Sequence, residues 1–163
     1  MCGIIGYVGH RPALPIVIEA LRRMEYRGYD SAGVAIADGD GAIRVEKKAG
    51  RLENLEKAIA EVGAENLSGT TGTGHTRWAT HGQPTDRNAH PHQDRAEDFS
   101  VVHNGIIENY APLRAELEDL GVEFDSDTDT ETAVHLLARE YRHGVHAGDF
   151  VASAYATLRR LEG

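Results

Sequence analysis

The spacing of apolar residues predicts strands and helices in the first half of the chain. Residues 4–9, IIGYVG, form a short branched apolar run bounded by glycine, which predicts a buried β-strand. Apolar side chains then recur every three or four positions over residues 12–28, which predicts a helix with prolines in its first turn. Two runs that flank the sequence DGDG predict a β-hairpin over residues 31–49. A second helix is expected over residues 52–63, closed by Gly63.

The middle of the chain, residues 69–94, changes character. It is rich in Gly, Thr and His and has little helical periodicity. We expect a strand near residues 73–79, followed by an irregular loop of a length that is usually functional or disordered. The run FSVVHNG, residues 99–105, predicts a further strand that ends at a turn.

Three more helices are predicted in the last third of the chain. Residues 110–121 are amphipathic and end at a glycine. Thr128 and Glu131 form a capping box that opens the next helix, and Asp149 precedes the last one. Because the strands gather apart from most of the helices, the pattern predicts an α+β fold in one domain, residues 1–163.

Charge and composition narrow the class of protein. The formal net charge of −9 disfavours nucleic acid as a partner, because nucleic-acid binding favours a basic surface. No apolar run approaches the ~18 residues of a membrane-spanning helix, so no membrane is expected, and the N-terminus lacks the pattern of a signal peptide. The single cysteine cannot form an internal disulfide, which predicts a reducing, cytoplasmic location.

The position of that cysteine, Cys2, predicts a nucleophile. Removal of Met1 is expected because the next residue is small, and it leaves a thiol and a free α-amine on one Cα. An α-amine has an unperturbed pKa of about 7.7–8.0, so it can accept the thiol proton without a histidine. Gly3 lets a substrate approach closely. The alternative is a Cys2 that is buried as a small hydrophobic residue.

A thiol that attacks an amide also needs hydrogen-bond donors for the oxyanion that forms. Asn104 and Gly105 follow the apolar run VVH and offer a side-chain amide and an unhindered backbone N–H. Asn-Gly is equally the favoured pair of a hairpin turn. From the residues alone, both interpretations stay open.

An amino-acid substrate needs charged partners as well. A bidentate guanidinium suits an α-carboxylate, and Arg77 lies in the Gly- and Thr-rich region. Asp129, at a helix start, suits an α-ammonium, or it simply caps the helix. Trp78, the only tryptophan, is either a core residue or a lid over a pocket. His81 is interpreted as structural, because the α-amine already serves as the base.

A metal-binding protein is the alternative from another class. His90-x-His92 offers two ligands, but no spacing or thiolate cluster supplies the rest of a site. The run DSDTDTE lacks the glycine and final glutamate of an EF-hand, and GTGHTR lacks the GK[ST] of a P-loop. We therefore predict no metal and no cofactor. Further histidines that bear on this alternative are His75, His81 and His103.

Six segments in order closely resemble the glutaminase domains of glutamine–fructose-6-phosphate aminotransferases, which are class II glutamine amidotransferases. The segments are CGIIGYVG, LRRMEYRGYDSAG, GHTRWATHG, NAHPH, VVHNGIIEN and SDTDTE. The resemblance runs from residue 2 to the end of the chain. It implies an N-terminal-nucleophile hydrolase fold, an αββα sandwich, and hydrolysis of glutamine to glutamate and ammonia through a γ-glutamyl thioester.

The same resemblance implies roles for particular residues. Cys2 matches the nucleophile, and Asn104 with Gly105 matches the oxyanion hole. Arg77 matches the residue that holds the α-carboxylate of glutamine, and Asp129 matches the partner of its α-ammonium. The remaining matches line, gate or order the same pocket, and they are Thr80, His81, Trp78 and Arg27.

The family's glutaminase domain continues beyond the last residues of this sequence, and two sugar-phosphate isomerase domains follow it. The sandwich is therefore expected to be incomplete at the C-terminus, and the isomerase domains would use the ammonia to convert fructose 6-phosphate to glucosamine 6-phosphate. The implied partners are glutamine, those isomerase domains and a second copy in a full-length homodimer. The alternatives are an inactive fragment or a regulatory or interaction piece.

Overall fold

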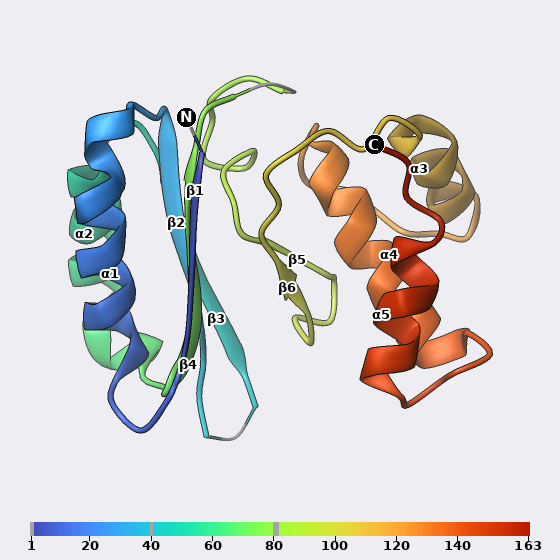
Figure 1. Cartoon of the computed structure of the whole chain (residues 1–163), viewed down its shortest axis with the longest axis horizontal. Helices are drawn as coiled ribbons and strands as arrows, with labels where there is room; N and C mark the ends of the chain where they lie inside the picture. The colour runs from blue at the N-terminus through green and yellow to red at the C-terminus, as the bar shows by residue number, and fades with distance from the viewer. Residues whose placement is uncertain (1, 40, 80–81) are drawn as a thin grey trace.

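The computed structural model describes residues 2–39, 41–79 and 82–163. Figure 1 shows four layers. The helices α1 (Ala13–Met24) and α2 (Leu52–Val62) cover one face of a four-stranded sheet. Beyond its other face lie a two-stranded sheet and then the helices α4 (Asp129–His143) and α5 (Phe150–Leu158). The predicted α+β class and the αββα order of layers are confirmed.

The large sheet is antiparallel and has the strand order β1-β4-β2-β3. Its strands are β1 (Gly3–Val8), β2 (Ser31–Ala37), β3 (Ile43–Ala49) and β4 (Thr71–Arg77). The predicted hairpin over residues 31–49 is the pair β2–β3 and is confirmed. The prediction of a buried first strand is wrong, because β1 lies at an edge of the sheet and, in the part of the chain that the structure describes, pairs with β4 alone. Ile4 and Val8 on it are 45% and 81% exposed.

The main core lies between this sheet and the helices α1 and α2. Apolar faces of both helices pack on β2, and the largest buried side chains are Val17, Leu21, Val34, Ile36, Leu52 and Leu55. Gly74 of β4 allows α1 to approach the sheet, because a Cβ there would lie 2.4 Å from Cγ1 of Val17. Each helix is followed by a short 3₁₀ turn, η1 (Glu25–Arg27) and η2 (Ala64–Leu67).

The second sheet is shorter than the sequence predicts. It consists of β5 (His92–Gln93) and β6 (Ser100–Val101). The predicted strand over residues 99–105 contributes only β6, because only β5 pairs with it within the described residues. The chain then continues as a loop. Asn104 and Gly105 therefore do not form a turn between paired strands, and the hairpin interpretation of this pair is wrong.

The three predicted helices of the last third are confirmed as α3 (Tyr110–Asp119), α4 and α5. Thr128 is the N-cap of α4, and its hydroxyl accepts the Glu131 N–H at 3.4 Å. Asp149 caps α5 in the same way. The capping box departs from the expected pattern at Glu131. Its carboxylate accepts the backbone N–H groups of Asp125 (2.8 Å) and Ser126 (2.6 Å), which fixes the turn before the helix.

The buried Glu131 carboxylate predicts a pH-dependent contribution to stability. Burial opposes its charge, but hydrogen bonds from His135, Ser126 and the backbone outweigh burial and lower the pKa of Glu131 from 4.5 to about 2. The carboxylate therefore stabilises the fold fully above pH 4.5, and this contribution is lost as the pH falls toward 2. Glu131→Gln is expected to lower the free energy of unfolding at pH 7 by about 1–3 kcal/mol in urea denaturation.

The pH dependence separates this effect from a general loss of packing. The difference between wild type and Glu131→Gln should shrink as the pH falls below 4.5, because the wild-type carboxylate becomes protonated. Glu61→Gln, at an exposed position of α2, serves as the control and should change the free energy of unfolding by less than about 0.5 kcal/mol. A difference that stays constant from pH 7 to pH 2.5 would contradict the role assigned to the charge.

Candidate active site

Segments that are far apart in the sequence meet at one cavity of about 230 Å³. Cys2 stands immediately before β1, and the register pairs Gly3 with Thr76, so Cys2 lies beside the end of β4. The loop after β6 and the first turn of α4, which belong to the two layers beyond the large sheet, line the same cavity. Six of the predicted site residues line it, and they are Cys2, Arg77, Trp78, Asn104, Gly105 and Asp129.

The Cys2 sulfur is fixed against the backbone that follows β4. Its Sγ accepts the Trp78 N–H at 3.2 Å, and the thiol donates toward the Trp78 carbonyl at 3.7 Å. The side chain is half-buried, so it reaches the cavity while the backbone holds it in position. An N–H aimed at the sulfur also stabilises negative charge on it. The interpretation of Cys2 as an inert, fully buried residue does not agree with this position.

Asn104 and Gly105 lie in the loop that leaves β6. Both residues line the cavity. Gly105 lies close to the His103 ring, and a Cβ at this position would lie 2.8 Å from Nε2 of His103, so a larger residue would have to displace that ring. The loop therefore brings an asparagine and a glycine to a cavity that Cys2 also lines. A side-chain amide and an unhindered backbone N–H are the kinds of donor that can stabilise an oxyanion.

Asp129 connects this loop to the start of α4. It is 6% exposed, and its Oδ2 accepts the Ile107 N–H at 2.7 Å. The Thr130 hydroxyl lies 3.4 Å from Oδ1 of Asp129 and 3.3 Å from Nδ1 of His103. The capping interpretation of Asp129 is wrong, because Thr128 is the cap and Asp129 is the first residue of the helix. Its carboxylate instead holds the loop and faces the cavity.

Arg77 is the last residue of β4, the strand that the sequence predicted near residues 73–79. It is 4% exposed, and its Nη2 donates to the Gly82 carbonyl at 3.3 Å. Burial lowers the pKa of Arg77, while Asp30, Cys2 and Asp129 oppose that effect. A guanidinium retains its charge under these conditions, so Arg77 supplies a fixed positive charge to the cavity.

Trp78 is 54% exposed, so the first of its two interpretations, a core residue, is wrong. The indole lines the mouth of the cavity, and Cζ3 of its ring lies 3.7 Å from the point where Gly28 would carry a Cβ. The neighbouring Arg27 does not line the cavity. It is exposed and donates from Nε to the Tyr26 hydroxyl at 3.3 Å. The predicted residues Thr80 and His81 lie outside the described residues.

Sequence reasoning missed part of the lining, which is made of His75, His90, His103, Ile106 and Thr130. The rings of His75 and His90 stack with centroids 4.5 Å apart. Burial, followed by the charge of Arg77, lowers the pKa of His75 to about 4, and burial also lowers that of His90, so both are neutral at pH 7. His75 was predictable as a lining residue, because alternate residues of β4 share one face with Arg77.

The structure also bears on the metal-binding alternative. His90 and His92 lie edge to face at 4.7 Å, and they have separate partners. Nδ1 of His90 accepts the His103 N–H at 3.3 Å, and Nε2 of His92 lies 2.9 Å from the Thr128 hydroxyl. Within residues 2–39, 41–79 and 82–163, no group of three or more His, Cys, Asp or Glu side chains converges to hold a metal ion. The described helices are also too short or too polar to cross a membrane.

Residues 40–157 match a protein family described as "Glutamine amidotransferase domain". Over the whole chain, the sequence is 68% identical to a glutamine–fructose-6-phosphate aminotransferase [isomerizing] of Mycolicibacterium smegmatis. It is 55% identical to the enzyme of the same name in Aquifex aeolicus. In both comparisons the chain spans 26% of the length of the relative.

Solved structures show the same fold. A glutamine phosphoribosylpyrophosphate amidotransferase from B. subtilis, complexed with ADP and GMP, superposes with a TM-score of 0.79 at 25% identity. The match covers the whole of this chain and 33% of that chain. A second structure, described as the allosteric regulatory enzyme of purine biosynthesis, gives a TM-score of 0.80 at 24% identity. This similarity concerns the fold alone. Its match covers the whole of this chain and 34% of that one.

Proposed function

The chain belongs to the glutamine amidotransferase domain family, and from this premise we propose that it hydrolyses the side-chain amide of glutamine at Cys2. The observation that carries the proposal is the meeting of Cys2, Arg77, Asn104 and Asp129 in one cavity. These four residues are separated by up to 127 positions in the sequence, and they supply a nucleophile, a cation, an oxyanion donor and a carboxylate.

The chemistry starts at the N-terminus. Once Met1 is removed, the α-amine of Cys2 takes the proton of the thiol, and the thiolate attacks the amide carbon of glutamine. The oxygen of the tetrahedral intermediate becomes negative and accepts hydrogen bonds from the Asn104 amide and the Gly105 N–H. The protonated amine then gives its proton to the leaving nitrogen, and ammonia departs. Water hydrolyses the remaining γ-glutamyl thioester to glutamate and regenerates Cys2.

Recognition of glutamine rests on charge. The guanidinium of Arg77 suits the α-carboxylate, and the Asp129 carboxylate suits the α-ammonium. Trp78 stands at the mouth of the cavity and serves as its lid. Thr80 and His81 are proposed to line the pocket, and Arg27 to order the segment that contacts the lid.

Asp129→Asn tests the recognition of the α-ammonium. Asparagine keeps an oxygen that can accept the Ile107 N–H, so the loop of Asn104 and Gly105 is retained, while the negative charge is lost. We expect KM for glutamine to rise about 10- to 100-fold, because a buried charge pair is removed, with a smaller effect on kcat. The measurement is steady-state glutamate release. Asp127→Asn, at a side chain that is 53% exposed, should leave KM within about twofold. An unchanged KM in Asp129→Asn would assign the α-ammonium to another group.

The function itself is tested with the purified chain and L-glutamine. Glutamate and ammonia should form in equal amounts, and intact mass should show a chain that has lost Met1. An electrophilic analogue of glutamine should modify Cys2 and no other residue, and glutamine should protect against it. A chain that has lost Met1 but neither releases glutamate nor reacts with the analogue would contradict the proposal.

In a longer protein, the ammonia has a further use. The relatives are named glutamine–fructose-6-phosphate aminotransferases, and they are about four times as long as this chain. Ammonia from Cys2 then serves the amination of fructose 6-phosphate to glucosamine 6-phosphate on isomerase domains, in a homodimer within the cytoplasm. Sizing of the full-length protein, together with an assay for glucosamine 6-phosphate, tests this assignment.

A further inference from the structure

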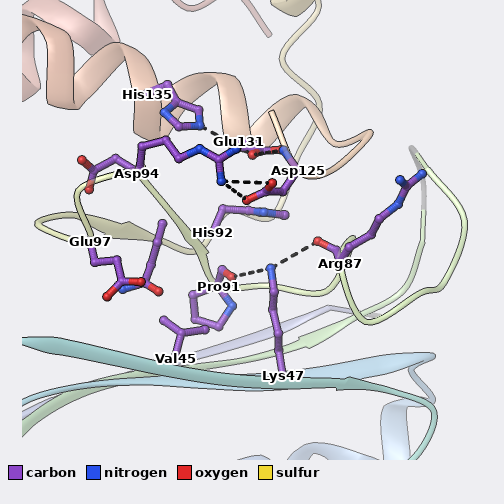
Figure 2. Close-up of a pocket in the computed structure, with 12 residues that line it drawn as sticks. Val45, Lys47, Arg87, Pro91, His92, Asp94, Glu97, Asp125, Glu131 and His135 are labelled. Atoms are coloured by element: carbon purple, nitrogen blue, oxygen red, sulfur yellow. Dashed lines mark hydrogen bonds and ion pairs between the residues drawn. The ribbon is translucent and has the colours of Figure 1, made fainter. Parts of the chain in front are cut away.

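A second cavity, of about 220 Å³, opens on the far side of the loop that carries His90. Figure 2 shows the Lys47 side chain extending from β3 toward the cavity. Pro91 and His92 line it from the loop, and Glu131 and His135 line it from α4. The two cavities share no lining residue; His90 lines the Cys2 cavity, and the next residues, Pro91 and His92, line this one. The chemistry proposed for Cys2 makes no use of it.

Lys47 is bound in an unusual way for a lysine. Its Nζ donates to two backbone carbonyls, that of Arg87 at 3.2 Å and that of Pro91 at 3.1 Å. Among the described residues, no carboxylate forms an ion pair with it, and the side chain is half-buried at the floor of the open cavity. Lys47 therefore lines a cavity that a small molecule can enter, and among the described residues it lacks an ion-paired carboxylate that would keep it protonated.

The charges around Lys47 do not cancel the effect of burial. Burial lowers the pKa of Lys47 to about 8. Glu131 from α4, Asp125 from the loop before it and Asp86 raise it, and Arg77 from β4 lowers it further. A lysine with this pKa is about half neutral at pH 8, whereas an ordinary lysine is less than about 1% neutral there.

The sequence contains three lysines, and Lys48 and Lys57 serve as controls for Lys47. Lys48 is the next residue on β3, but it pairs with Asp86 at 3.0 Å, and that hydrogen bond raises its pKa. Lys57 pairs with Glu53 at 3.0 Å on the surface of α2. Lys47 therefore differs from both in its environment and not in its type.

We propose that Lys47 is a nucleophilic lysine that accepts acyl groups from small activated acyl donors, and that this modification weakens the Cys2 site. In the reaction, the neutral Nζ attacks the acyl carbon and an amide bond forms. The bond to the phosphate or thiolate leaving group breaks and that group leaves with the electron pair. The nitrogen releases one proton to water, and nothing is oxidised or reduced. No other co-reactant is needed.

The consequence follows from the two carbonyls. An acylated lysine is uncharged and retains one N–H, so it can keep at most one of the bonds to Arg87 and Pro91. The segment that loses support packs directly on β2, since a Cβ at Gly33 would lie 2.1 Å from the His90 carbonyl. His90 also accepts the N–H of His103, the residue before Asn104. Two hydrogen bonds therefore connect Lys47 to the loop of Asn104 and Gly105. They are the bond from Lys47 to the Pro91 carbonyl and the bond from the His103 N–H to His90.

The experiment exposes the purified full chain to acetyl phosphate in one arm and to acetyl-coenzyme A in the other, at about pH 8. Peptide mass spectrometry then follows acetylation of the three lysines separately. With at least one of the two donors, the rate of acetylation at Lys47 should be about five or more times the rates at Lys48 and Lys57. The donor that gives this selectivity is the one that Lys47 accepts. Rates at Lys47 that are equal to or below those at the other two lysines in both arms would overturn the proposal.

The second readout is glutamate release, and this part rests on the proposed function. Release should fall in proportion to acetylation of Lys47 in wild type and in Lys48→Arg. In Lys47→Arg the same treatment should lower glutamate release no further than acylation of the Cys2 thiol and α-amine, followed by the same mass spectrometry, accounts for. Selective acetylation of Lys47 without loss of glutamate release would overturn the connection to Cys2. A chain that releases no glutamate before treatment would contradict the proposed function, while the labelling rates would still decide the reactivity of Lys47.

Discussion

Replacement of Cys2 by alanine is expected to abolish glutamate release from glutamine, with a loss on the order of 10⁴-fold or more. The proposed reaction runs through a covalent thioester, and no other cysteine is present in the chain to form one. The neighbouring histidines do not replace it, because His75 and His90 are buried and neutral. The measurement is glutamate formation over hours at saturating glutamine, with the electrophilic analogue as a second test.

Two controls separate the loss of the nucleophile from a loss of the fold. Cys2→Ala removes one half-buried sulfur whose hydrogen bonds within the described residues go to the Trp78 backbone, so the free energy of unfolding in urea should change by less than about 1 kcal/mol. Glutamine should still bind, because Arg77 and Asp129 are unchanged. A wild-type protein that retains Met1 should be as inactive as the alanine variant. Wild-type rates in either protein would refute the role of the Cys2 thiol and its α-amine.

The fold could be predicted from the sequence wherever a local pattern decides it. The hairpin over residues 31–49 and the helix capped by Thr128 follow from alternation, turn residues and capping chemistry, which act over a few positions. Errors arose where pairing between distant segments decides the outcome. The pattern of β1 is that of a buried strand, but its place at the sheet edge depends on β4, which is more than 60 residues away. The apolar run at residues 99–105 likewise needs a partner strand to extend beyond β6.

The site was predictable in part, for a similar reason. Chemistry made Cys2 a candidate nucleophile, because an α-amine at the N-terminus supplies a base beside the thiol. The roles of Arg77 and Asp129 depended on resemblance, since each residue type also has a common structural role. Local propensity gave no sign of the hydrogen bond from Ile107 to Asp129, or of the contact of His103 with Gly105. Both are tertiary contacts across the cavity.

Asn104→Ala is expected to lower kcat by about 10²- to 10³-fold, which corresponds to the loss of one oxyanion donor, about 3–4 kcal/mol. Asn104 lies in the loop after β6 and lines the Cys2 cavity, while Gly105 and its N–H are retained in the variant. Because the oxyanion exists only in the transition state and the intermediate, KM for glutamine should change by less than about threefold.

The kinetic pattern distinguishes an oxyanion donor from a residue that merely shapes the loop. If Asn104 only positioned the loop, Ala would disturb Ile107 and its bond to Asp129, and KM would rise together with the fall in kcat. Asn66→Ala, which removes a side chain that bonds to the Val62 carbonyl far from the cavity, should leave both constants within about twofold. If the reaction of the electrophilic analogue with Cys2 also develops negative charge on an oxygen, that reaction should be slower in Asn104→Ala. A fall in kcat of less than about fivefold would leave the Gly105 N–H as the main donor and would refute the role assigned to the Asn104 amide.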